Sequence, residues 1–185
     1  MRGARIGWAA VAVLVAGVLP AAGQSGLRRA KDIVAPSAYV SLDPVPRGRA
    51  FELAVVMKIR PGFHVNAREV SEDYLIPTEL TAGPLAGFRF GTTNYPKGVL
   101  RTFPFSKTPL NLYEGSVTLR IRMEALASAP LGLQKIALKL RYQACSDSIC
   151  LPPVTLPIEV NLEVAPAGAS VQPVHPEIFA NQAGG

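Results

Sequence analysis

Alternation of apolar and polar side chains at a period of two is the feature that most restricts how this chain can fold. It runs through four stretches: residues 51–60, 117–123, 135–142 and 154–164. Successive side chains of an extended strand point to opposite faces, so each stretch predicts a half-buried β-strand. Pro157 lies within the last stretch and cannot donate to a ladder, which indicates an edge position or a bulge. Weaker strands are expected at residues 38–42, 64–66, 78–81 and 88–90.

No stretch shows a sustained helical period. The 16 glycines and 17 prolines are scattered along the chain, as turns between many short strands require. Seven or eight strands with one polar face each predict an all-β fold, an antiparallel β-sandwich. The chain of 185 residues suits one domain of ordinary size.

The N-terminus has the pattern of a secretory signal peptide, predicted at residues 1–23. Arg2 and Arg5 precede an apolar run at residues 6–19, and small residues follow at 20–23. The run is shorter than the roughly 20 residues of a spanning helix, although an uncleaved membrane anchor is the alternative. We therefore expect an exported protein of the periplasmic type.

The remaining boundaries follow from composition. Residues 24–36 are small, polar and basic and are expected to form a linker, with the folded domain at residues 37–165. Residues 166–185 are rich in Pro, Ala, Gly and Ser and are predicted to be a disordered tail, apart from a short turn at 175–180.

The charge pattern argues against nucleic-acid binding. Removing the signal peptide takes away Arg2 and Arg5 and no acid, which lowers the formal charge from +6 to +4. The remaining basic residues alternate along strands without forming a block, and no aromatic residues lie between them.

The chain has two cysteines, Cys145 and Cys150, in the loop between the last two strong strands. Export predicts that they form a disulfide. A structural bridge would be the simple interpretation, yet closing so short a loop stabilises a fold by only about 2 kcal/mol. Short exposed bridges tend to be the labile ones, so a redox role is favoured.

Other chemistries find little support in the sequence. A metal site would need more ligands than two cysteines, His64 and His175, and the Cys-x4-Cys spacing is not a usual zinc spacing. No Gly-x-Ser-x-Gly motif is present. Asp147 lies between the cysteines, where its carboxylate disfavours a thiolate and favours a reducing pair.

Two short motifs enclose the cysteine loop: Tyr-Gln-Ala-Cys at residues 142–145 and Cys-Leu-Pro-Pro at 150–153. Four further motifs precede them: Gly-Phe-His-Val-Asn at 62–66, Tyr-Leu-Ile-Pro-Thr at 74–78, Tyr-Pro-Lys-Gly at 95–98 and Leu-Tyr-Glu-Gly at 112–115. These segments resemble the N-terminal (alpha) domain of the thiol:disulfide interchange protein DsbD, in the protein-disulfide reductase family, and the two motifs around the cysteines are the most specific. Together these segments extend the resemblance over most of residues 38–164.

The resemblance implies an immunoglobulin-like sandwich and a thiol–disulfide interchange activity that needs no cofactor beyond the dithiol. Electrons would come from a membrane-embedded donor and pass to thioredoxin-fold periplasmic proteins, of the disulfide isomerase or cytochrome-maturation type. Cys150 would attack the partner's disulfide and Cys145 would resolve the mixed disulfide. An aromatic cap loop covers the cysteines in this family, and Phe103 or Phe105 is its expected counterpart here.

The sequence departs from the family pattern in two ways. Four residues separate the cysteines, where the best-known members have five, which is expected to change the reduction potential. The membrane and thioredoxin-like parts of DsbD are not in these 185 residues, so we expect a stand-alone module with a separate membrane electron donor.

Residues around the motif have simpler interpretations as well. His64 and Asn66 are expected to be hydrogen-bonding residues of a turn or sheet end. Tyr142 is expected in the core, with a hydroxyl that could reach the cysteine loop. The rival function is a non-catalytic binding module whose disulfide only holds the loop.

Overall fold

The four alternating stretches form the long strands of the protein in the computed structural model, which describes residues 29–180. These strands are β4 (Arg49–Ile59), β10 (Ser116–Ala125), β11 (Gly132–Tyr142) and β13 (Val154–Ala165). β4 pairs with β10 and β11 with β13, both antiparallel and in continuous register. The signal peptide predicted at residues 1–23 lies outside the described residues.

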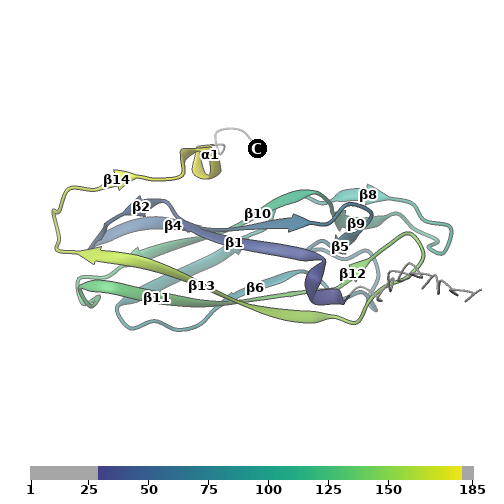
Figure 1. Ribbon diagram of the computed structural model, residues 1–185, viewed down its shortest axis with the longest axis horizontal. Helices are drawn as coiled ribbons and strands as arrows, with labels where there is room; N and C mark the ends of the chain where they lie inside the picture. Colours follow the sequence, from purple (N-terminus) through teal and green to yellow (C-terminus); the bar gives the residue numbers. More distant parts are fainter. Residues whose placement is uncertain (1–28, 181–185) are drawn as a thin grey trace, which may run out of the picture.

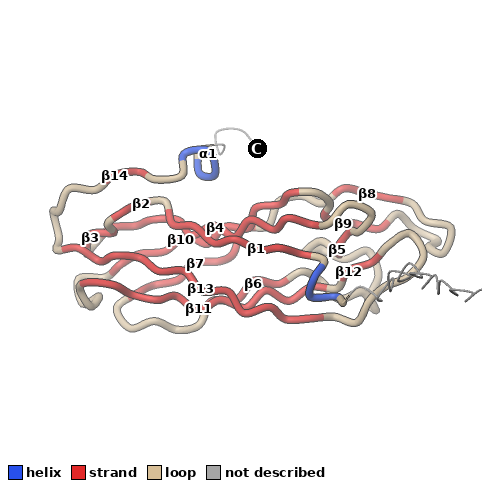
Figure 2. The backbone as a smooth tube through the Cα atoms, in the orientation of Figure 1, coloured by secondary structure: helices blue, strands red, loops and turns tan. Residues whose placement is uncertain are grey.

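Each pair of long strands is the centre of a four-stranded sheet, and the two sheets face each other (Figures 1 and 2). The first has the order β1-β4-β10-β7 and gains β1 (Val34–Val40) and β7 (Phe88–Asn94). The second has the order β3-β13-β11-β6 and gains β3 (Val45–Pro46), which runs parallel to β13, and β6 (Glu79–Ala82). The predicted all-β sandwich is therefore confirmed.

The core lies between the sheets and is built from the alternating positions of the long strands. All of the following belong to one buried apolar cluster: Phe51, Leu53, Val55, Met57, Ile59, Leu119, Ile121, Met123, Ile136, Leu138, Leu140, Tyr142, Ile158, Val160, Leu162 and Val164. Because strand side chains alternate between faces, the period of two in the sequence is enough to select the inward set.

Pro157 lies at an edge, as its missing amide hydrogen requires. It pairs with Lys139 of β11 without a shift of register. On the other side of β13, β3 is the neighbouring strand in the described part of the chain, and it pairs only with Val164 and Ala165, far from Pro157. The proline therefore interrupts no ladder.

A third sheet closes one end of the sandwich, at the right in Figure 1. Its order is β12-β5-β9-β8, made of β12 (Ala144–Cys145), β5 (His64–Asn66), β9 (Leu110–Tyr113) and β8 (Val99–Arg101). The sequence predicts the position of β5, but the partners of so short a strand come from the tertiary structure.

The N-terminal boundary differs from the one expected from composition. A 3₁₀ turn, η1 (Ala30–Asp32), and the start of β1 occupy much of the segment assigned to a linker. Ile33 and Val34 are 1% and 3% exposed, and the Tyr142 hydroxyl donates a hydrogen bond of 2.8 Å to the Ala30 carbonyl. Burial of these side chains holds residues 30–36 against the sandwich. Residues 24–28 lie outside the described part.

The C-terminal segment also differs from the disordered tail that composition suggests, as far as Ala180. β14 (Gln172–Pro173) pairs with β2 (Leu42–Asp43), and α1 (Pro176–Phe179) lies over the outer face of the first sheet (Figure 1). Two outward side chains of the first sheet contact this C-terminal segment. The Tyr39 ring lies 4.9 Å from the His175 ring, and Arg120 donates a hydrogen bond to the Ile178 carbonyl. Ala54, which pairs with both Tyr39 and Arg120, is fully buried, so the tail contributes to the packing of this face.

Within residues 29–180, no helix has the length and apolar character needed to cross a membrane.

Candidate functional site

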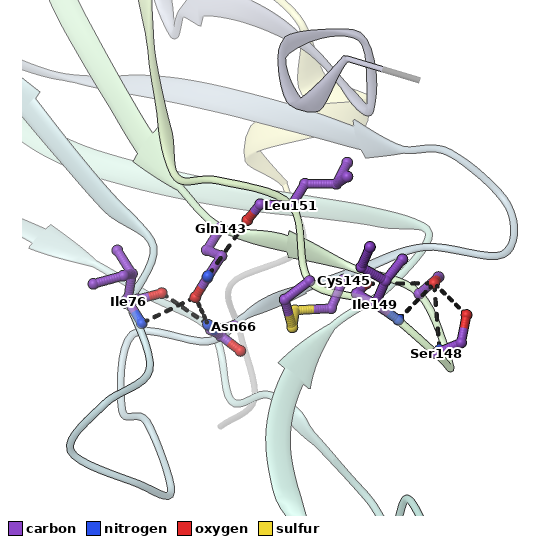
Figure 3. Close-up of a disulfide and its surroundings, with 9 residues drawn as sticks. Asn66, Ile76, Gln143, Cys145, Ser148, Ile149 and Leu151 are labelled. Carbon is purple, nitrogen blue, oxygen red and sulfur yellow. Dashed lines mark hydrogen bonds between the residues drawn. A yellow bond between two sulfur atoms is a disulfide. The ribbon is translucent and has the colours of Figure 1, made fainter. Parts of the chain in front are cut away.

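The two cysteines form a disulfide across a miniature hairpin (Figure 3). Cys145 and Cys150 face each other as an isolated antiparallel bridge, with Cα atoms 4.0 Å apart. A backbone hydrogen bond flanks them on each side: Ser146 N donates to Ile149 O, and Leu151 N donates to Ala144 O, both at 2.8 Å. The predicted disulfide is therefore confirmed, and backbone hydrogen bonds also hold its loop.

This hairpin lies at the end of the sandwich because the chain changes sheets after Tyr142. β11 ends in the second sheet, and β12 then pairs with β5 of the third sheet, with Ala144 opposite Val65 and Cys145 opposite His64. The bridge joins neighbouring residues of one loop and does not connect the two main sheets. A loop bridge of this kind adds little to the packing of the core.

The two sulfur-bearing residues differ sharply in exposure. Cys145 is 2% exposed, whereas Cys150 is exposed to solvent. After Cys150 come Leu151, Pro152 and Pro153, and the prolines have no amide hydrogen with which to pair. The geometry therefore exposes one cysteine to solvent and keeps the other inside the protein.

A network of amide groups holds the hairpin against the third sheet. The Asn66 side-chain amide donates to the Ile76 carbonyl at 3.0 Å and to the Gln143 side-chain oxygen at 3.3 Å. Gln143 in turn donates to the Leu151 carbonyl at 3.4 Å, on the strand that carries Cys150. Figure 3 shows this network on one side of the disulfide. Asn66 and Gln143 thus fix both strands of the hairpin.

An aromatic stack begins at the residue opposite Cys145. The His64 ring lies 4.9 Å from the Phe103 ring, which stacks at 5.1 Å on Phe105. Phe103 is 8% exposed and packs with Leu75, Leu110 and Leu112, whereas Phe105 is 55% exposed. The inner ring of the stack is therefore part of a small apolar cluster, and the outer ring faces solvent.

Charged side chains surround the rim of this stack. Arg101 pairs with Glu114 at 2.7 Å, and both line a shallow cleft together with Phe103 and Asp147. Burial lowers the pKa of His64, Glu114 and Asp147 act to raise it, and Arg101 acts to lower it. Burial dominates this balance and favours the neutral imidazole beside Cys145.

The match to a known family decides the class of the chain. The family model described as "Thiol:disulfide interchange protein DsbD, N-terminal" matches residues 30–162. The chain belongs to this family. It is a thiol:disulfide interchange domain of the DsbD N-terminal type, and it contains a Cys145–Cys150 disulfide.

Among solved structures, the chain is similar to the N-terminal periplasmic domain of ScsB from Proteus mirabilis. The two share 13% sequence identity with a TM-score of 0.45, over 69% of this chain and 46% of that one. The chain thus spans about half the length of that structure. No curated protein matches the chain.

The structure brings some of the expected site residues of this DsbD-type domain together and separates one. Asp147 and Phe103 line the same cleft, and the stack joins Phe105 to Phe103. Tyr142 points elsewhere: it is fully buried, and its hydroxyl bonds to Ala30, not to the cysteine loop. Burial also raises the pKa of Tyr142 to about 12.

Sequence reasoning assigned His64 and Asn66 to hydrogen bonding and missed that they adjoin the disulfide. Asn66 does form hydrogen bonds, and its position next to the cysteine hairpin comes from the pairing of β5 with β12. Alternation places His64 and Asn66 on one face of a strand, which is the only local signal that they act together.

Within the described part of the chain, no three His, Cys, Asp or Glu side chains gather as they would around a metal ion.

Proposed function

We propose that this domain passes electrons through the Cys145–Cys150 pair to thioredoxin-fold proteins of the periplasm, of the disulfide isomerase or cytochrome-maturation type. A separate membrane dithiol would supply the electrons. The observation that carries the proposal is the asymmetry of the disulfide, with Cys145 buried and Cys150 exposed. Membership of the DsbD N-terminal family and the signal pattern of residues 1–23 support a periplasmic location.

The reaction needs only the two thiols and the partner's disulfide. The Cys150 thiolate attacks one sulfur of that disulfide, the partner's S–S bond breaks, and the other partner sulfur leaves as a thiolate. Cys145, as a thiolate, then attacks Cys150 Sγ in the mixed disulfide. The Cys145–Cys150 bond forms and the partner leaves as a dithiol, so two electrons pass from this domain to the partner.

Exposure supports this division of roles. A partner's disulfide can approach Cys150, which lies at the surface, while Cys145 at 2% exposure is accessible mainly to Cys150 itself. Asp147, two residues from Cys145, adds negative charge near the pair and disfavours the thiolate until a partner docks.

We assign the shielding role to Phe103 and Phe105. Phe103 contacts the His64 ring, and His64 lies opposite Cys145 in the sheet, so the stack adjoins the buried side of the disulfide. Phe105 extends the stack into solvent, where a docking partner would meet it first. Displacement of this loop would then accompany docking.

Trapping tests the assignment of roles. Full-length Cys145→Ala should accumulate a mixed disulfide with an oxidised periplasmic disulfide isomerase, because Cys150 attacks and no resolving thiol remains. Cys150→Ala is the matched control and should trap far less. Both products are separated on non-reducing gels and identified by mass spectrometry.

Equal trapping by the two variants, or stronger trapping by Cys150→Ala, would show that the roles are wrongly assigned. If neither variant traps a partner and the double-alanine variant still binds it, the disulfide is structural and the domain is a binding module.

A further inference from the structure

Asn66 has one buried polar atom that finds no partner within residues 29–180. The residue is 1% exposed, and its other polar groups are satisfied: Nδ2 donates to two oxygens, the backbone N–H donates to Gln143 O, and the carbonyl accepts from Thr78 Oγ1 at 2.6 Å. Because Nδ2 faces two oxygen acceptors, the amide can only be oriented this way. The remaining atom, Oδ1, receives no hydrogen bond from any described residue.

This oxygen lies on the same face of the third sheet as the buried cysteine. The side chains of Asn66 and Gln143 touch, so they share a face, and His64 and Cys145 are two residues further along the same pair of strands. Strand alternation therefore puts Cys145 on that face, diagonal to Asn66, where Cβ atoms are roughly 7–8 Å apart and only side chains that extend toward each other can meet. In Figure 3 the Asn66 amide lies on the same side of the disulfide as the Gln143 side chain.

A buried acceptor without a donor costs free energy, and here the missing donor has an obvious source. A disulfide sulfur carries no hydrogen, whereas a thiol is a hydrogen-bond donor. We propose that Asn66 Oδ1 accepts a hydrogen bond from the Cys145 thiol when the disulfide is reduced. Asn66 is then a positioning residue that responds to the redox state of the pair.

The step balances with a dithiol partner as the electron source, and it rests on the redox cycle of the proposed function. The partner dithiol gives up two electrons and two protons and becomes a disulfide, while the Cys145–Cys150 bond breaks to form two thiols. The proton on Cys145 Sγ is the one that bonds to Asn66. Cys145 is thereby held inward, and Cys150 is left free to react.

The hydrogen bond would favour the dithiol over the disulfide. The Nδ2 bonds to Ile76 and Gln143 do not involve sulfur, so they stabilise both redox states and cancel in the reduction equilibrium. The Oδ1 contribution does not cancel, because only the reduced state supplies its donor. The reduction potential of the pair therefore reports the hydrogen bond to Oδ1 separately from the structural role of the Asn66 amide.

The test compares three full-length proteins equilibrated in glutathione buffers. Asn66→Leu keeps the branched shape and removes the oxygen, and should lower the equilibrium constant for reduction by about fivefold. That corresponds to a potential about 20 mV more negative, since a tenfold change is about 30 mV. Thr78→Val is the control, because it removes the hydrogen bond to the Asn66 backbone carbonyl and leaves Oδ1 in place.

An unchanged potential in Asn66→Leu, or an equal shift in Thr78→Val, would overturn the inference. A wild-type pair that cannot be reversibly reduced and reoxidised would instead overturn the proposed function, and this inference with it.

The unmodified protein gives a second test if Asn66→Leu does not fold. The carbon-13 resonance of the Asn66 side-chain carbonyl should move downfield on reduction, because its oxygen gains a donor. Asn161, exposed on β13, serves as the internal control and should not move. A stationary Asn66 resonance would contradict the hydrogen bond.

Discussion

Reduction of the Cys145–Cys150 bond should lower the free energy of unfolding by only about 2 kcal/mol, as expected for the entropy of so short a closed loop. The bridge joins residues with a sequence separation of 5. Two backbone hydrogen bonds, Ser146 to Ile149 and Leu151 to Ala144, hold the same hairpin without the sulfurs. The core between the two main sheets includes neither cysteine. Reduction thus removes a cross-link from a hairpin that its backbone hydrogen bonds still hold, and the core stays intact.

Urea unfolding with and without a thiol reductant measures this difference. Far-UV circular dichroism follows the strands, and the slope of the transition should stay nearly constant because the exposed area on unfolding hardly changes. The double variant Cys145→Ala/Cys150→Ala is the control for direct effects of the reductant, and its midpoint should not respond to it. Substitution alone is a less direct measurement, because Cys145 is buried and its replacement also leaves a small cavity.

A loss of more than about 4 kcal/mol on reduction would refute this reasoning, since chain entropy cannot supply that much from a loop of this length. Such a result would show that the disulfide is a structural bridge and would favour the binding-module interpretation.

Three further outcomes follow from individual side chains. Tyr142→Phe should lower the free energy of unfolding by about 1–2 kcal/mol, because it leaves the Ala30 carbonyl without its donor. The wild-type protein should lose stability between pH 10 and 12, because the unfolded chain releases the tyrosine proton first, and the variant should lose less. Urea titrations at pH 8–12 measure both effects. The free energy of unfolding should fall as pH drops below about 6.5, because burial lowers the pKa of His64 in the folded protein and the unfolded chain binds the proton first. His64→Phe should reduce the slope of the free energy of unfolding against pH by at most about 1.4 kcal/mol per pH unit. An unchanged slope would contradict the buried neutral imidazole. Phe105→Ala should speed the reaction of the reduced pair with a small aromatic disulfide while leaving the fold intact. Phe103→Ala should speed the same reaction and also lower the free energy of unfolding by about 3–5 kcal/mol, because its ring is buried. An unchanged rate in both variants would show that the stack does not shield the disulfide.

The sequence alone predicted the long strands and their inward residues. In β4, for example, Phe51, Leu53, Val55, Met57 and Ile59 are all buried, as their alternation predicts. The prediction works because the direction of a strand side chain depends only on its own backbone, which alternates with a period of two. The edge position of Pro157 follows from equally local chemistry, its missing amide hydrogen.

The ends of the domain were harder to predict, because composition does not reveal what a segment packs against. Residues 30–36 are held by burial of Ile33 and Val34 and by the hydrogen bond from Tyr142, more than 100 positions along the chain. The segment up to Ala180 is held by Tyr39 and Arg120, whose outward side chains meet it on the first sheet. These partners are distant in sequence, so polar composition alone suggested a linker and a tail.

The cysteine site likewise combines features that the local sequence determines with features that depend on residues distant in the chain. The sequence by itself determined that Cys145 and Cys150 lie in one short loop and can form a disulfide, because their spacing is a property of the local chain. The tertiary structure decided which cysteine is buried and that His64 lies opposite Cys145. It also decided that Asn66 keeps, on the same face, an oxygen to which no residue of the described chain donates. Each of these features depends on the pairing of β12 with β5, two strands of two and three residues. Strands so short carry too little pattern to specify their partner, and only the packing of the whole sandwich brings them together.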